Sequence, residues 1–203
     1  MVAMSLEKMK TKSISPLKFL LLFTMNNRKL ILYISMSLDG YIATKDDDLS
    51  WLSMVEKEGE DYGYKDFNDT VDAYIVGRNT YDIILKLTGG VFPQAKQHKC
   101  YIITRQERKS ENGVTFYNGS IEELISGLKK EEGKNIYCDG GAEIVKLLME
   151  KNLIDEYIIS VIPVSLGDGK RLFKGGTPKI DLELLSSESF ETGLVQLHYK
   201  RKD

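Results

Sequence analysis

A glycine, a guanidinium and a hydroxyl group stand together where an apolar run turns into a helical pattern. The residues are Gly77-Arg78-Asn79-Thr80. A helix N-terminus offers unpaired backbone N–H groups, Gly77 lets the backbone approach a ligand, and Arg78 and Thr80 add a charge and a hydroxyl. The segment could therefore bind phosphate. The same residue types also suit an ordinary capped turn, and the segment alone does not decide between the two.

A second segment of this kind follows the apolar run at residues 136–138. It reads Asp139-Gly140-Gly141-Ala142-Glu143 and opens another helical pattern. Paired glycines remove both side chains where a backbone passes close to a ligand, and the following helix directs its positive end to the same place. A plain tight turn is the alternative interpretation.

A third, smaller group is Thr104-Arg105, at the end of an apolar run. Arg105 could pair with a phosphate monoester, although a single arginine at a strand end is often only a surface residue. Ligands of open α/β sheets gather beyond the carboxyl ends of the strands. We therefore expect these segments to meet at one edge of a sheet.

Other well-known sites are not indicated. Gly167-Asp168-Gly169 begins like a dinucleotide-binding fingerprint, but the sixth position is leucine and no strand-to-helix context precedes it. There is no P-loop, and His98 and His198 are not clustered with the cysteines. The sequence predicts no metal site.

Strands and helices must alternate to position these segments. Nearly continuous apolar runs predict buried strands at residues 30–35, 73–76, 100–103 and 136–138. Between the third and fourth runs, apolar residues recur at i, i+3, i+4 and i+7 behind the capping candidate Ser120, which predicts a helix from residue 121.

The pattern changes in the last fifty residues. A long strand is predicted at 157–164, followed by strands at 182–190 and 194–199 that form a hairpin. Parallel units followed by an antiparallel end indicate a three-layer α/β/α domain around a mixed, mostly parallel sheet.

Composition fits one such domain. The chain has 203 residues, of which 42% are hydrophobic and 29% charged, and its formal net charge of −2 excludes the basic surface typical of nucleic-acid binding. The lysine-rich residues 1–27 differ from the rest, and their apolar run is too short to span a bilayer. We expect a cytoplasmic protein whose translation begins at Met25, with a non-native or disordered extension at 1–27 and one folded domain at 28–203.

The ordered set of motifs resembles the dihydrofolate reductase superfamily, and more closely the reductase domain of riboflavin biosynthesis. The motifs are the stretch from Leu32 to Ala43, the two glycine segments, and Pro163-Val164 ahead of the stretch from Gly167 to Phe173. The match runs from about Arg28 to Lys202. The resemblance implies a mixed sheet of about eight strands, NADPH as hydride donor, and no metal.

The resemblance also implies roles for individual positions along the cofactor, including a cis peptide between the paired glycines. The implied cofactor residues are Gly77, Arg78 and Thr80 for the pyrophosphate and adenosine phosphates, Thr104 and Arg105 for the 2′-phosphate, Gly140, Gly141, Ala142 and Glu143 beneath the pyrophosphate, and Ser35, Ile42 and Ala43 beside the nicotinamide.

The substrate side is less defined. Dihydrofolate reductases place a carboxylate near the start of their first helix, and here a helix is expected to run through Glu56, Asp61 and Phe67. Counting from flanking motifs gives Glu56 or Asp61, of which Asp61 is preferred, with the Ser160 hydroxyl supporting the carboxylate. A solvated helix face is the alternative for either acid.

The resemblance implies an NADPH-dependent oxidoreductase that acts on a pyrimidine- or pterin-like small molecule. Reduction of 5-amino-6-(5-phosphoribosylamino)uracil comes first and dihydrofolate reduction second. A non-catalytic NADPH-binding module is the alternative from another class. Members of such families commonly pair, so a homodimer is expected, with no nucleic-acid or membrane partner.

Overall fold

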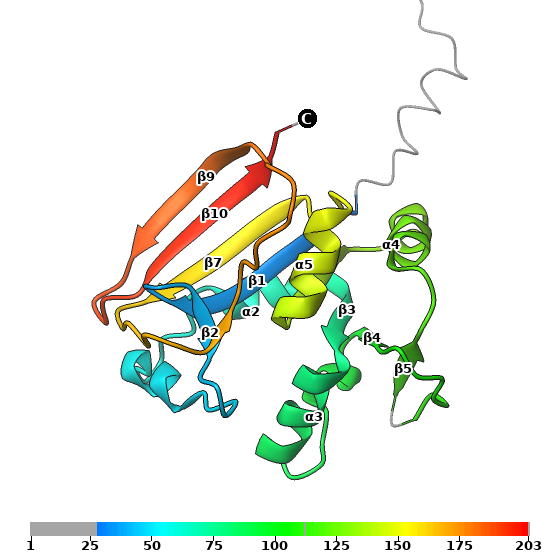
Figure 1. The fold of residues 1–203 in the computed structure, drawn as a ribbon, viewed down its shortest axis with the longest axis horizontal. Coiled ribbons are helices and arrows are strands. Elements are labelled where there is room, and N and C mark those ends of the chain that lie inside the picture. The colour runs from blue at the N-terminus through cyan, green and yellow to red at the C-terminus, as the bar shows by residue number, and fades with distance from the viewer. Residues whose placement is uncertain (1–27, 112, 203) are drawn as a thin grey trace, which may run out of the picture.

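One eight-stranded sheet forms the centre of the molecule in the computed structural model, which describes residues 28–111 and 113–202. The strand order is β5-β4-β3-β6-β1-β7-β10-β9. The first six run parallel, and β10 and β9 complete the sheet as an antiparallel pair (Figure 1). The strands are β1 (Leu30–Ser37), β3 (Val71–Gly77), β4 (Lys99–Ile103), β5 (Val114–Tyr117), β6 (Asn135–Gly140), β7 (Glu156–Ile162), β9 (Leu182–Ser189) and β10 (Val195–Arg201).

Helices cover both faces of this sheet. On one face α4 (Ile121–Lys130) and α5 (Ala142–Glu150) pack their apolar side chains on the strands. On the other face lie α2 (Tyr64–Asp69), α3 (Arg78–Leu87) and an aromatic cluster. Two short 3₁₀ helices, η1 (Ser50–Val55) and η2 (Pro93–Lys96), complete the helical layer. The predicted three-layer fold with a C-terminal hairpin is confirmed.

Local signals explain several element boundaries. The Ser120 hydroxyl accepts a hydrogen bond from the Glu123 backbone N–H at 3.2 Å, so α4 begins where its capping box predicts. The strand predicted at 157–164 ends at Ile162. A small second sheet pairs β2 (Tyr41–Ala43) with β8 (Lys170–Arg171), and no sequence pattern predicted it.

One predicted helix is shorter than expected, because only its last part forms a helix, α2 at Tyr64–Asp69. The helix expected to run through Glu56 and Asp61 is a loop at residues 56–63, between η1 and α2. Gly59, Tyr62 and Gly63 have positive φ angles of 78°, 57° and 75°, which no α-helix accommodates.

The expected translation start at Met25 and the extension at 1–27 lie outside the described residues. Among residues 28–111 and 113–202, no helix is both long and apolar enough to cross a lipid bilayer.

Candidate active site

Two helices begin directly at the carboxyl edge of the sheet. Helix α3 starts at Arg78 after β3, and α5 starts at Ala142 after the Gly140-Gly141 end of β6. Strands β3 and β6 are neighbours, so the two N-termini lie at the same edge. Neither helix has a side-chain cap among the described residues. Their first N–H groups and positive dipole ends are therefore available to an anion.

Glycine is required where these two turns approach each other. A Cβ on Gly77 would lie 2.9 Å from Ile144 Cγ1, and one on Gly141 would lie 2.9 Å from Thr80 Oγ1. Gly140 has a φ angle of 95°, and its peptide bond to Gly141 is cis, as the resemblance implies. The side-chain-free backbone thus brings both helix N-termini together.

Two arginines flank this edge. Arg78 forms an ion pair with Asp82 one turn along α3 and donates a hydrogen bond to Asn79 Oδ1 at 2.7 Å. Arg105 is exposed and follows Thr104 at the end of β4, the strand beside β3. The arrangement fits a phosphate-rich dinucleotide, with uncapped N–H groups for the pyrophosphate and guanidinium groups for further phosphates.

Around Glu143, in the first turn of α5, further charges gather. A hydrogen bond from Lys174 lowers the pKa of Glu143, and Arg105 contributes in the same direction. Strand β3 lies between β4 and β6, so the segment after β4 and the start of α5 lie at the same edge of the sheet. The structure therefore brings the predicted pyrophosphate and 2′-phosphate residues to one region.

The residues expected beside a nicotinamide lie further along the same edge. Ile42 and Ala43 belong to β2, and the Ile42 side chain is 3.9 Å from where a Gly141 Cβ would stand. Asp39, in the turn before β2, accepts hydrogen bonds from the N–H groups of Leu166 at 3.0 Å and Gly167 at 2.7 Å. These bonds fix β2 against the loop that leads to β8.

A cavity of about 600 Å³ opens beside Ser35, on the α2 face of the sheet. Its floor carries two hydroxyl groups on adjacent strands, because Ser35 of β1 pairs with Ser160 of β7. Gln196 of β10 is the register partner of Ser160 and bonds to it, but does not line the cavity itself. The loop at 56–63 forms one wall. The volume is ordinary for a small-molecule site.

All three predicted catalytic residues line this cavity, but they do not contact one another. Both Asp61 carboxylate oxygens accept backbone N–H groups, from Gly63 at 3.0 Å and Lys65 at 3.1 Å, so Asp61 secures the entry to α2. Glu56 is exposed. The Ser160 hydroxyl accepts a hydrogen bond from Gln196 Nε2 at 3.2 Å, whereas the expected partner was a carboxylate.

Gln196 is a polar residue of the cavity region that the sequence did not indicate. Besides Ser160, its Nε2 contacts Tyr33 Oη at 3.1 Å and the Tyr62 carbonyl oxygen at 3.2 Å. Burial raises the pKa of Tyr33, and the charge of Asp61 raises it further, whereas the hydrogen bond from Gln196 lowers it. In the sequence Gln196 is only one polar position of an alternating strand, so no local signal distinguished it.

Asp139 is the other residue whose environment was not foreseen. It accepts hydrogen bonds from the Tyr74 hydroxyl and, at 2.8 Å, from the Tyr137 hydroxyl. Loss of hydration raises its pKa to about 6, because this cost exceeds the benefit of the two hydrogen bonds. The Asp139 charge also helps to raise the pKa of Tyr64, which lines the cavity. A carboxyl group with a raised pKa therefore bonds to two tyrosines of the aromatic cluster on the α2 face.

Comparisons with known proteins show a family and several relatives to which this chain is similar. Residues 28–196 match the RibD C-terminal domain. The uncharacterized Bacillus subtilis protein YwjB is 45% identical, over 86% of this chain and 98% of its own, and the uncharacterized YyaP of the same organism is 30% identical, over 86% and 96%.

Solved structures share the architecture. A crystal structure of a candidate riboflavin biosynthesis protein from Shewanella has a TM-score of 0.78 and 28% identity, covering 86% of this chain and 99% of that one. The deaminase/5-amino-6-(5-phosphoribosylamino)uracil reductase of Thermotoga maritima has a TM-score of 0.67 at 16% identity, covering 91% of this chain and 59% of its own. The latter likeness concerns the fold alone.

Proposed function

The chain belongs to the RibD C-terminal domain family, and we propose that it is an NADPH-dependent reductase of a small pyrimidine- or pterin-like ring. One observation carries the proposal: two uncapped helix N-termini lie at the sheet edge that also borders a cavity of about 600 Å³. A dinucleotide bound along this edge would place its phosphates at the helices and its nicotinamide at the cavity.

At the phosphate end, the chain would contribute charge and close approach. The first N–H groups of α3 and α5 would bind the pyrophosphate, with Gly77 and Gly141 allowing the two turns to meet. Arg78 would exchange its ion pair with Asp82 for a phosphate, and Arg105 would bind the 2′-phosphate that distinguishes NADPH from NADH.

At the cavity end, the chain would hold the substrate and exclude water. When bound, NADPH would supply a hydride to an electrophilic carbon of the substrate, whose neighbouring nitrogen or oxygen takes up a proton. Ser35 and Ser160 would position the ring edge from the cavity floor. Asp61, Glu56 or water would deliver the proton, as the sequence also left open.

The compound named for the Thermotoga relative, 5-amino-6-(5-phosphoribosylamino)uracil, is the first substrate to test, followed by dihydrofolate. Oxidation of NADPH is followed by the loss of absorbance at about 340 nm. Tight binding without oxidation of NADPH on either substrate would instead favour a binding module.

Arg105→Ala tests the cofactor assignment directly. Loss of a charged hydrogen bond costs about 1.5–3 kcal/mol, so the affinity for NADPH should fall about 10- to 100-fold. The affinity for NADH should stay nearly constant, because NADH lacks the 2′-phosphate. Calorimetric titration measures both, and Arg108→Ala is the matched control because Arg108 is exposed and bound to Glu111. Equal losses for NADH and NADPH would contradict the assignment.

A further inference from the structure

The cavity that we assign to the substrate has an unusual charge. Four carboxylates stand along one wall, on Glu56, Glu58, Glu60 and Asp61, and the only cation among the described lining residues is Lys57. Lys57 Nζ lies 2.5 Å from a carboxylate oxygen of Glu191, so its charge is already balanced. The wall therefore carries an excess of negative charge.

Two of these carboxylates are held in place by the loop that bears them. Glu60 accepts a hydrogen bond from the Tyr62 N–H at 2.9 Å, and Asp61 accepts N–H groups from Gly63 and Lys65. The negative charge is thus a built feature of the loop. Its influence reaches Tyr33, whose hydroxyl bonds to the Tyr62 carbonyl oxygen of the same loop at 3.1 Å and whose pKa the Asp61 carboxylate helps to raise.

The remaining surface suits a flat, polar ring. Tyr33, Tyr62 and Tyr64 contribute aromatic side chains, and Ser35 and Ser160 contribute hydroxyl groups. Aromatic rings stack on planar heterocycles, and hydroxyl groups can donate to or accept from the ring edge. None of these groups provides a counter-charge for an anion.

We propose that the substrate is a neutral or positively charged planar heterocycle without a phosphate group, selected against phosphorylated analogues by the acidic loop at 56–61. This inference rests on the proposed function and narrows it. Phosphate binding in proteins relies on arginine, lysine or helix N-termini, and in this molecule α3 and α5 present those features at the cofactor end of the edge. At the cavity, a substrate phosphate would meet four carboxylates and a single lining cation, Lys57, which is already paired with Glu191.

A matched pair of ligands tests the inference. The probes are 5-amino-6-(5-phosphoribosylamino)uracil and its dephosphorylated counterpart, titrated into the full chain saturated with NADPH at low and at moderate salt. Like charges repel at these distances even through water, and salt screens them. The dephosphorylated compound should bind about tenfold more tightly at low salt, and the ratio should shrink as salt is added.

A charge reversal on the loop distinguishes electrostatic repulsion of the substrate phosphate from a poor steric fit of that phosphate in the cavity. Glu58 is exposed and makes no hydrogen bond or ion pair in the described structure, so Glu58→Lys should leave the fold intact and shift the binding ratio about three- to tenfold toward the phosphorylated compound. Glu132→Lys is the matched control, because Glu132 is exposed in the loop before β6, at the opposite edge. The control should leave the ratio unchanged.

Three results would overturn the inference: preference for the phosphorylated compound, a ratio insensitive to salt and to Glu58→Lys, or binding of neither ring compound to the NADPH-saturated protein. Absence of NADPH binding is a different result, since it would remove the proposed function itself. A titration of NADPH into the protein without substrate distinguishes that case.

Discussion

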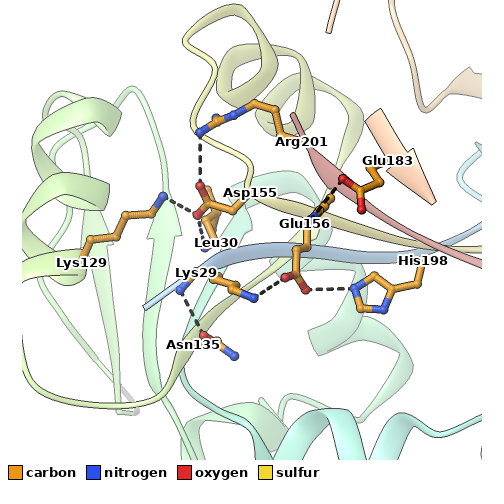
Figure 2. A network of polar contacts seen from close by, with 10 residues as sticks. Lys29, Leu30, Lys129, Asn135, Asp155, Glu156, Glu183, His198 and Arg201 are labelled. Carbon is orange, nitrogen blue, oxygen red and sulfur yellow. Dashed lines mark hydrogen bonds and ion pairs between the residues drawn. The ribbon is translucent and has the colours of Figure 1, made fainter. Parts of the chain in front are cut away.

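The two edges of the sheet use similar charged residues in opposite ways. At the amino edge, Glu156 bonds to Lys29 Nζ at 2.5 Å and to His198 Nε2 at 2.9 Å, and only 9% of its side chain is exposed (Figure 2). At the carboxyl edge, Glu56, Glu58 and Arg105 are exposed. Paired charges at the amino edge hold elements together, whereas exposed charges at the carboxyl edge remain available to ligands.

Asp155 shows how completely the amino edge is tied. Its carboxylate accepts the Leu30 N–H at 2.8 Å and forms ion pairs with Lys129 of α4 and Arg201 of β10. One side chain thereby joins the start of β1, the end of α4 and the end of β10. Changes at this edge should alter stability alone, while changes at the carboxyl edge should alter binding, and four substitutions test this contrast.

Gly140→Ala should have the largest effect, because it disturbs the backbone of the carboxyl edge itself. Gly140 has a φ angle of 95°, and an added Cβ would lie 3.1 Å from Ile34 Cδ1. We expect a loss of about 2–4 kcal/mol in the free energy of unfolding, together with weaker NADPH binding. Urea denaturation and calorimetry measure the two quantities.

The control is Gly127→Ala in α4, where an added Cβ meets nothing within 4 Å. That variant should be slightly more stable than the parent, since alanine favours helices over glycine. Equal behaviour of the two variants would show that the edge does not depend on its glycine conformation.

Glu156→Gln tests the amino edge. The hydrogen bond with His198 is the main cause that lowers the pKa of Glu156, to about 2, from its ordinary value of 4.5. A carboxylate whose pKa is lowered in the folded state stabilises the fold at pH values above its pKa in the unfolded chain. This contribution is lost as pH falls through about 2. The variant should lose about 2 kcal/mol of unfolding free energy at pH 7, with a smaller difference below pH 4.5.

The affinity of this variant for NADPH should remain within about twofold of the parent, because Glu156 lies at the opposite edge of the sheet from the proposed cofactor residues. Denaturation across the pH range and a calorimetric titration provide both measurements. A large loss of NADPH affinity would break the contrast between the edges.

The two edges also differ in how far the sequence predicted them. Gly77, Arg78 and Gly140 could be placed because each belongs to a strand, a turn and a helix that are contiguous in the chain. The buried strands and the capped helix α4 follow from periodicity in the same way. Each of these predictions depends on residues only a few positions apart.

The cavity could not be predicted in this manner. Its floor joins Ser35 and Ser160 from two strands, with Gln196 bonded to Ser160 from a third, and only the register of those strands brings them together. A helix was expected over 56–63 from the resemblance to dihydrofolate reductases, but the positive φ angles of Gly59, Tyr62 and Gly63 make this segment a loop. The predicted support of a carboxylate by Ser160 was replaced by Gln196, a partner 36 positions away.

Asp139→Asn should change stability in the opposite direction to Glu156→Gln. The pKa of Asp139 is raised from 3.8 to about 6, so its favourable contribution is present below pH 3.8 and is lost as pH rises through about 6. Asparagine resembles the protonated form, and the variant should be about 1–2 kcal/mol more stable than the parent at pH 8. The difference should vanish near pH 4.

Denaturation at pH 8 and pH 4 checks this sign. If the variant is more stable at pH 8 but turns over more slowly, the ionisable Asp139 at the carboxyl edge lowers the stability of the fold while it supports activity. A destabilised variant at pH 8 would show instead that the carboxylate, with its two tyrosine hydrogen bonds, supports the fold.

Gln196→Ala should have the smallest effect on stability and should separate the cavity from the cofactor end. Removing the amide leaves Ser160 and Tyr33 without this donor, at a cost of about 1 kcal/mol in unfolding free energy. On the proposed function, kcat/KM for the substrate should fall about tenfold, while the dissociation constant for NADPH should not change. Gln97→Ala, an exposed glutamine near η2, is the control. If the variant weakened NADPH binding as strongly as it reduced kcat/KM, the cavity and the cofactor end would be one coupled site, even though the Gln196 side chain bonds only to Tyr33, Tyr62 and Ser160 among the described residues.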